Sequence, residues 1–571
     1  MTRGDNRPVP RQLKIASLGL LLLLASAVFE APVEGQAPKA VSKMMYVLPN
    51  YLGHSGRSDA QFAADVSDLR QRLGEGRFVR VGFSMFIIVS MDDWNVNLTD
   101  HAAIRAALAS TIAQMDFIIK RARASGIPVN FSIQTAVRDR YDPVQTDAER
   151  ADRRNTSWYA DGQMANGWMT YSRYARKFRN VFEAYARELG SVLANRMARY
   201  PSTVISSSGD GESEMSYTRS LIVDPTYTEA TSQLCDYSPF AIAEFRDWLR
   251  NGGLYAQGQP FAGQGYDQAA RYQGDAAPGT DTNGDGHTLN GDFGTSFTSW
   301  NLKHFDWSLN DPLEGDPNSI PSFVYEGASF NPLPSQNPAG FDAPRTRTPG
   351  NRWWDTWDFF RAIMVWHYNV DFARWMTTTA DTDTKRTVPS SKWFSHQLPG
   401  DYLFGSSPSN PNFRLITSAS PYWVGDISPY GGLGITSFNI NAGGGHYFHT
   451  TRNVVPQISA RGVRWAILEW NPSVPVSNSL DVYEQEMAVI EQYKPTVVVP
   501  WAWGSTQPAS RVENTPFEIA LRDMIARVKD GPTSGSFGPS FAPMFLPPGE
   551  TADLRPLGSL WPIRVPRRQE K

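Results

Sequence analysis

The chain has 571 residues, of which 41% are hydrophobic and 12% aromatic, and its formal net charge is -3. This length and composition predict a large buried core, and the lack of excess basic charge argues against a nucleic-acid-binding protein. A single cysteine, Cys235, excludes an intramolecular disulfide, and no Cys/His cluster has the spacing of a zinc site.

The N-terminus has the pattern of an export signal. Basic residues come first, at Arg3, Arg7, Arg11 and Lys14. The apolar run that follows, residues 15–29, is shorter than the roughly 20 residues of a membrane span and typical of a signal-peptide core. We therefore expect a signal peptide over 1–37 and no stable membrane span after its cleavage; an uncleaved anchor is the alternative. A chain of this size without disulfides favours secretion or a periplasmic location in a bacterial envelope.

Strand-like apolar runs alternate with helical patterns through most of the remaining chain. The predicted strands are residues 43–48, 78–83, 129–133, 203–208, 392–396, 435–440, 463–468 and 496–501. Apolar residues at spacings of three and four predict the helices between them, one of which is expected to begin after Asp100 and to end at Gly126. Eight strands joined by helices or long crossovers are the number found in a (β/α)8 TIM barrel.

The alternation is interrupted after the fourth predicted strand. A short helix is expected from Ser238, as its cap, to Asn251. The residues that follow are rich in Gly, Pro, Asn, Asp and aromatic side chains and show no periodicity, which is typical of a long functional loop region. We predict a large irregular insertion over 251–350 within a catalytic barrel of residues 38–530, followed by a Pro-rich tail over 531–571.

The fourth and seventh predicted strands both lead to carboxylates. The segment TVISSSGDGESE places Asp210, Glu212 and Glu214 after strand four, and AILEWNP places Glu469 at the end of strand seven. Groups at the carboxyl ends of barrel strands share one mouth. Glycoside hydrolysis requires one protonated carboxyl to donate to the leaving oxygen and one ionised carboxylate to attack the anomeric carbon or to activate water.

Glutamates after strand four and at strand seven resemble the catalytic pair of the clan A glycoside hydrolases. The segment SPFAIAEFRDWLRN resembles the corresponding helix of the β-galactosidase family of that clan. The resemblance implies a retaining hydrolase of β-linked sugars or oligosaccharides, with Glu469 as nucleophile and Glu212 as acid/base. The GDGE segment is similar to the strand-four acid loop of β-amylases, which implies an inverting glucan hydrolase as the first alternative. A non-catalytic carbohydrate-binding barrel is the second.

Polar and aromatic residues near other strand ends are candidate substrate-binding residues. They are Asn50, Asp210, Glu214, His396, Asn439, Trp470, Trp501 and Trp503. Amide, imidazole and carboxylate groups can bind sugar hydroxyls, and a sugar ring stacks on an indole face. Trp501 and Trp503 are two residues apart on strand eight, so we expect both on one side of that strand. The clan resemblance implies that a tryptophan there forms the floor of the sugar site.

The segment DTNGDGHTLNGD has the spacing of a calcium loop. Positions 1, 3, 5 and 12 of an EF-hand-like loop are occupied by Asp281, Asn283, Asp285 and Asp292, and His287 can offer its carbonyl. Asp at position 12 departs from the usual bidentate Glu. We expect a structural calcium ion that rigidifies the insertion, with no cofactor required for the chemistry; a Gly/Asp turn without metal is the alternative. The sequence predicts no oligomeric state.

Overall fold

The chain divides into two units, residues 1–43 and 44–571, and all residues that the structure describes belong to the second. The structure is a computed structural model that describes residues 44–52, 56–89, 96–134, 158, 160, 176–209, 236–253, 269–305, 335, 337–346, 348, 350–397, 427–438, 455, 459, 462–471, 480–505 and 511–531. The signal peptide predicted over 1–37, and all but the first residue of the predicted tail, lie outside these residues.

Eight parallel strands close into a barrel. Strand one consists of β1 (Met45–Val47) and β2 (Asn50–Tyr51), and strand two consists of β3 (Val79–Val81) and β4 (Phe83–Ile88). The other six are β5 (Val129–Gln134), β6 (Val204–Gly209), β9 (Trp393–Gln397), β10 (Gly432–Phe438), β11 (Trp465–Asn471) and β12 (Val497–Trp503). Neighbours in the barrel follow the order of the chain, and β12 pairs with both β11 and β2, which closes the ring. This topology confirms the predicted (β/α)8 TIM barrel.

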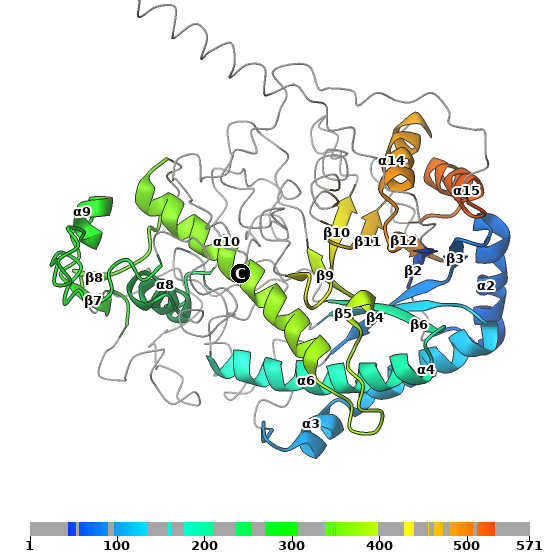
Figure 1. Ribbon diagram of the computed structural model, residues 1–571, viewed down its shortest axis with the longest axis horizontal. Coiled ribbons are helices and arrows are strands. Elements are labelled where there is room, and N and C mark those ends of the chain that lie inside the picture. The colour runs from blue at the N-terminus through cyan, green and yellow to red at the C-terminus, as the bar shows by residue number, and fades with distance from the viewer. Residues whose placement is uncertain are drawn as a thin grey trace, which may run out of the picture. The chain divides into compact units, whose positions relative to one another are not determined.

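Helices connect the strands and form the outer layer (Figure 1). They are α2 (Asp59–Leu73), α3 (His101–Ala107), α4 (Ala109–Ser125), α6 (Arg176–Arg199), α10 (Arg352–Thr378), α14 (Leu480–Tyr493) and α15 (Pro516–Val528). Neighbouring helices contact one another in pairs: α14 with α15, α15 with α2, α2 with α4, α3 with α6, and α6 with α10. In the described part of the chain no single helix is long and apolar enough to cross a membrane; α3 and α4 pass that test only together, as a pair bent by 65°.

Helix ends follow the local sequence. Asp100 caps α3 by accepting hydrogen bonds from the backbone N–H groups of Ala102 and Ala103. Gly126 ends α4 in the left-handed conformation, with φ of 62°. The helix predicted over this region is divided in two at Leu108, between α3 and α4.

Several strands extend further toward their carboxyl ends than the sequence predicts. The second strand is interrupted at Gly82 and then continues to Ile88 as β4. A Cβ atom at Gly82 would lie 2.0 Å from the Pro128 carbonyl oxygen, so this close approach of two strands requires glycine. Strand seven includes Glu469 and strand eight extends to Trp503. Polar and aromatic residues continue the pairing there, although the aliphatic pattern that marks a strand has ended.

One part of the barrel interior is filled by aliphatic side chains and one phenyl ring, which we name the lumen cluster. Its buried members are Leu48, Ile205, Phe394, Ala466, Leu468, Val497 and Val499. Gly434 leaves the space that Leu468 occupies, because a Cβ atom at Gly434 would lie 2.0 Å from Leu468 Cδ1. The interior at this level is a packed core and not a channel.

Between β6 and α10 lie α8 (Pro239–Asn251), α9 (Leu289–Phe293) and the paired parallel strands β7 (Ser299–Leu302) and β8 (Gly340–Phe341). Phe245 of α8 packs its ring 4.9 Å from that of Trp357 and 5.0 Å from that of Phe360, both on α10. Figure 1 shows these elements beside the first half of α10, at a distance from the barrel strands. The insertion predicted over 251–350 falls here, and its described residues contain more regular structure than expected.

Candidate active site

A hydrogen-bonded polar layer lies next to the lumen cluster. Asn130 Nδ2 donates to Ser84 Oγ at 2.9 Å, and Ser206 Oγ donates to Asn130 Oδ1 at 2.8 Å. These contacts join β4, β5 and β6 across the barrel interior. Side chains of one strand alternate between its two faces, so Phe86 and Gln134 also face the interior, nearer the carboxyl ends of β4 and β5. The interior therefore becomes more polar toward its mouth.

Asn50 belongs to this inward-facing set. It pairs in register with Ser84 on β4 and with Trp501 on β12. Asn50 is 1% exposed, and within the described residues its buried Oδ1 atom has no hydrogen-bond partner. A buried acceptor left unpaired costs about 1–3 kcal/mol, and a ligand hydroxyl or a water molecule would remove that cost. Asn50 is thus placed to accept a hydrogen bond in the mouth, and its role in substrate binding stays a prediction.

Phe86 and Trp501 form an aromatic wall beside Asn50. Their ring centroids are 5.3 Å apart, with planes at 89°. Trp501 is half-buried, so part of its indole remains accessible. Phe86 and Gln134 are mouth residues that the sequence reasoning missed, because the predicted second and third strands ended before them. Every second residue of a strand faces the same side, so counting two residues on from Ser84 gives Phe86, and counting four on from Asn130 gives Gln134.

Glu469 reaches the mouth through a β-bulge. Ile435 of β10 pairs with Ile467, but the next residue, Thr436, pairs with Glu469, so Leu468 is an extra residue on β11. The pairing with β12 is shifted over the same interval. Leu468 belongs to the lumen cluster, and Thr436 lies two residues after the inward-facing Gly434. Glu469 therefore faces the interior directly after Leu468, and it is 8% exposed.

Trp470 points away from the mouth, which corrects its prediction as a substrate-binding residue. Its indole Nε1 donates to Glu486 Oε2 of α14 at 2.8 Å, and its ring lies 4.7 Å from that of Phe517 on α15. The side chain is 1% exposed and fills the space between the barrel and these two helices. This outward direction also fixes the inward direction of its neighbour Glu469, because successive side chains of a strand alternate.

Trp501 and Trp503 do not share one side of β12, contrary to the expectation from their spacing. Trp501 pairs with Asn50 and Trp503 pairs with Tyr51, so two steps along β12 match one step along β2. Tyr51 faces outward, where its ring contacts that of Phe62 on α2 at 5.7 Å. Trp503, 2% exposed, follows Tyr51 into the core beneath the helices. Only Trp501 is placed to contact a ligand in the mouth; its peptide bond to Ala502 is cis.

His396 lies near the end of β9 and faces the interior beside Gly434, with which it pairs. The side chain is 4% exposed. Burial lowers the pKa of His396 to about 4, so the imidazole is neutral at pH 7. A neutral imidazole can both donate and accept hydrogen bonds, which suits the recognition of sugar hydroxyls.

Four predicted site residues lie outside the described residues: Asp210, Glu212, Glu214 and Asn439. The strands that lead to them are described to their carboxyl ends. Asp210 directly follows the last residue of β6, Gly209, and Asn439 directly follows the last residue of β10, Phe438. Both strands have their carboxyl ends at the end of the barrel where Glu469 is located.

The predicted calcium loop is organised by its own hydrogen bonds. Asp281 accepts from the backbone N–H groups of Gly284 and Gly286, at 2.6 and 2.9 Å. The N–H group of Asp285 donates to Asn283 Oδ1, and the N–H group of His287 donates to Asp285 Oδ1. In the described part of the chain, no group of three or more His, Cys, Asp or Glu side chains is arranged to hold a metal ion.

Asp292, at the last position of that loop, already has protein partners. It accepts hydrogen bonds from Arg271 Nε at 3.1 Å and from the Tyr272 hydroxyl at 2.9 Å, and lies 3.1 Å from His287 Nδ1. Burial raises the pKa of this carboxyl, but these hydrogen bonds and the charge of Arg271 outweigh it and hold the pKa below its ordinary value. Calcium binding at this loop remains a prediction, and it would require Asp292 to exchange partners.

Comparisons with known proteins add little to the topology. No protein-family model matches the chain, and no curated protein sequence matches it. The chain is similar to the catalytic domain of a β-amylase from Paenibacillus polymyxa, at a TM-score of 0.46 and 9% identity, over 86% of this chain and 96% of that one. It is also similar to a family 5 xyloglucanase from Paenibacillus pabuli, at a TM-score of 0.32 and 10% identity, over 86% of this chain and 99% of that one. Similarity at these scores carries no argument about activity.

Proposed function

We propose that the protein is a glycoside hydrolase whose catalytic carboxylate is Glu469. The observation that carries the proposal is the position of Glu469 at the carboxyl end of β11, turned into the mouth of a closed parallel barrel by an extra residue. In (β/α)8 enzymes this end of the barrel holds the active site. A carboxylate held there is suited to attack an anomeric carbon or to activate water.

The preferred mechanism is retaining, with Glu212 as the acid/base and a β-linked sugar or oligosaccharide as substrate. Glu212 protonates the leaving oxygen while Glu469 attacks the anomeric carbon, and Glu212 then removes a proton from the incoming water. Asp210 and Glu214 are negative neighbours of Glu212, which favours a protonated acid. If Glu212 proves dispensable, Glu214 is the next candidate.

The remaining mouth residues support substrate binding. Asn50 presents an unpaired buried oxygen, and Trp501 and Phe86 present aromatic surface beside it. Together they offer one hydrogen-bonding group and one stacking surface, the two contacts that a sugar ring needs for orientation. His396 and Asn439 are proposed to bind hydroxyls on the opposite side of the ring of strands. No cofactor is proposed for the chemistry.

Two alternatives differ in the number and role of the carboxylates. An inverting, β-amylase-like enzyme would use one glutamate as acid and the other as base, separated by about 6.5–9.5 Å, whereas retention requires about 5–5.5 Å. A non-catalytic carbohydrate-binding barrel would need neither. The anomeric configuration of the first product, followed by NMR, separates the two mechanisms, and the absence of any turnover favours the third function.

A screen of aryl glycosides with the wild type, Glu469→Ala and Glu212→Ala tests the proposal. We expect Glu469→Ala to abolish hydrolysis, with partial rescue by azide, which can enter the space left by the carboxylate. With glycosides that have very good leaving groups, Glu212→Ala should still form the glycosyl-enzyme, since these need no proton, but it should hydrolyse that intermediate slowly, so a burst of leaving-group release precedes slow turnover. Glu491→Ala, a half-exposed glutamate on α14, serves as the control and should leave activity unchanged. Hydrolysis that persists undiminished in Glu469→Ala would contradict the assignment of the nucleophile.

A further inference from the structure

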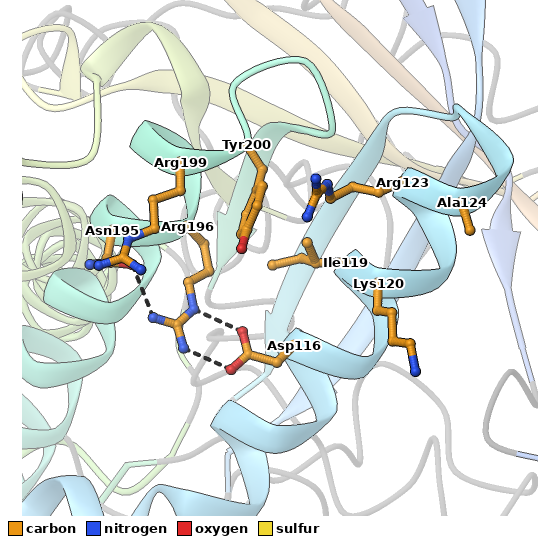
Figure 2. Close-up of a pocket in the computed structure, with 9 residues that line it drawn as sticks. All are labelled: Asp116, Ile119, Lys120, Arg123, Ala124, Asn195, Arg196, Arg199 and Tyr200. Carbon is orange, nitrogen blue, oxygen red and sulfur yellow. Dashed lines mark hydrogen bonds and ion pairs between the residues drawn. The ribbon is translucent and has the colours of Figure 1, made fainter.

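A groove of about 600 Å³ lies between α4 and α6, where both helices end (Figure 2). α4 ends at Ser125, shortly before β5 begins, and α6 ends at Arg199, shortly before β6 begins. The groove is therefore at the amino ends of the strands, opposite the mouth that holds Glu469. Its volume falls within the roughly 300–1,000 Å³ typical of small-molecule sites and exceeds what a single inorganic ion fills.

Basic side chains dominate the lining of the groove. Lys120 and Arg123 come from α4, and Arg196 and Arg199 come from α6. The one acidic lining residue, Asp116, is neutralised by Arg196, which contacts both of its oxygens at 2.8 and 2.7 Å. Figure 2 shows this pair, and the other lining cations are Lys120, Arg123 and Arg199.

Two of these three cations have no acidic partner within the described residues. Lys120 makes no ion pair or hydrogen bond there, and Arg123 contacts only the ring of Tyr200, at 4.6 Å from its centroid. Arg199 lies 3.4 Å from Asp383, but both side chains are more than half exposed, at 54% and 69%. Exposed pairs of this kind contribute about 0–1 kcal/mol, so an incoming anion can displace Asp383.

The helix dipole explains part of this charge but not its arrangement. Carbonyl groups at a helix C-terminus favour a cation in the last turn, which accounts for Arg123 on α4 and for Arg196 and Arg199 on α6. Lys120 lies one turn earlier and gains little from that effect. Cations from two helices line one hollow, where each raises the potential felt by an anion.

Tyr200 gives the groove an aromatic surface. Its ring stands between the cations of α4 and those of α6, and its hydroxyl points toward Ile119 and Asp116 (Figure 2). The guanidinium of Arg123 lies over one face of this ring, at 4.6 Å from its centroid, and the two side chains together line one part of the groove. A sugar that bears a carboxylate or a sulfate combines apolar ring surface with negative charge, which suits a groove lined by cations and an aromatic side chain.

We propose that this groove is a second binding site that holds an acidic stretch of a polysaccharide, with Lys120, Arg123 and Arg199 at its anionic groups. The anion site rests on the groove itself; the choice of a glycan as carrier of the anion rests on the proposed function. The site lies apart from the mouth, so it would hold the polymer near the enzyme without taking part in hydrolysis.

Affinity electrophoresis with polygalacturonate, neutral dextran, double-stranded DNA and added inorganic sulfate tests the proposal on the full protein. Polygalacturonate should retard the wild type, and dextran should not. Lys120→Ala/Arg123→Ala should weaken retardation by about tenfold, as expected for the loss of two charge-assisted contacts. The control, Arg511→Ala/Arg522→Ala, removes two exposed charges near and on α15 and should bind as the wild type does. Thermal melting verifies that both double variants are folded.

Three results would overturn the proposal: equal weakening in both double variants, equal retardation by DNA, or stabilisation by sulfate in thermal melting without any retardation by polygalacturonate. The first two would indicate non-specific charge attraction, and the third would indicate a site for a small oxyanion only. Glu469→Ala should bind polygalacturonate normally. If it does, and the wild type hydrolyses no glycan, the proposed function fails while the groove remains a polysaccharide site.

Discussion

The two ends of the barrel interior are built on the same strands but from different side chains. Toward the amino ends, Leu48, Phe394 and Leu468 meet in the lumen cluster with their aliphatic neighbours. Toward the carboxyl ends, inward-facing positions carry Asn50, His396 and Glu469, all of them buried. Apolar side chains contribute stability through burial, whereas a buried amide, imidazole or carboxylate costs desolvation unless it finds a partner. The structure thus separates stability from chemistry along each strand.

The sharpest test of this separation compares the neighbours Leu468 and Glu469. Leu468→Ala should lower the free energy of unfolding by about 2–5 kcal/mol, since it removes lumen contacts and leaves a cavity beside Gly434. Glu469→Gln should change it by less than about 1 kcal/mol, because a mouth residue contributes little packing. Urea denaturation of both variants measures the difference.

A double variant sharpens that comparison further. In Gly434→Ala/Leu468→Ala the new methyl group enters the space that Leu468 Cδ1 vacates, so the loss should be smaller than for Leu468→Ala alone. Equal destabilisation by Leu468→Ala and Glu469→Gln would contradict a division of the strand into a stabilising and a chemical part.

Acid should destabilise the barrel through His396. Its pKa is about 4 in the folded protein and about 6.5 when unfolded, so unfolding takes up a proton between these values. The contribution is fully present above pH 6.5, falls as the pH decreases, and amounts to roughly 3 kcal/mol over the full interval. Chemical denaturation between pH 7.5 and 4.5 should show that the free energy of unfolding depends less steeply on pH in His396→Gln than in the wild type. An unchanged dependence would show that folding does not shift the pKa of this imidazole.

Glu486 should support the mouth from the helix side. Glu486→Ala removes the acceptor of the Trp470 indole and leaves its N–H group buried, at a cost of about 1–3 kcal/mol. Because Trp470 adjoins Glu469, we also expect a lower kcat with little change in KM. Glu486→Gln retains an acceptor and should restore most of both quantities. Loss of activity in Glu486→Gln equal to that in Glu486→Ala would point to the charge of Glu486 and not to its hydrogen bond.

The smallest effect is expected from calcium at the loop that contains Asp281. Figure 1 shows its neighbouring helix α9 on the far side of α10 from the barrel strands, so any ion there stabilises the region between β6 and α10 and not the mouth. We expect calcium to raise the melting temperature slightly, and Asp281→Ala to remove that rise without an effect on hydrolysis. Calorimetric titration of metal-free protein that shows neither heat nor a change in melting temperature would remove the calcium prediction.

Apolar runs and helical periodicity were sufficient to predict the barrel and its eight strands, because a parallel barrel needs continuous apolar strands separated by amphipathic helices. The same reasoning placed Glu469 and Asn50 at the mouth. It failed for Trp470 and Trp503, since the direction of each depends on an extra residue in the pairing between two strands. That register is a property of two segments distant in the chain, and neither segment alone contains it. The groove between α4 and α6 was missed because it depends on how two helices distant in the chain pack together, which the pattern of neither helix contains.

The bulge at Leu468 lets two consecutive residues of β11 face the barrel interior, where a regular strand offers only every second residue. Leu468 fills the space beside Gly434, and Glu469 lies one step further toward the mouth. Deletion of Leu468 would leave the glutamate opposite Thr436 but would empty that space. The extra residue therefore lets one strand serve packing and the mouth at neighbouring positions, and its loss should be felt first as a loss of stability.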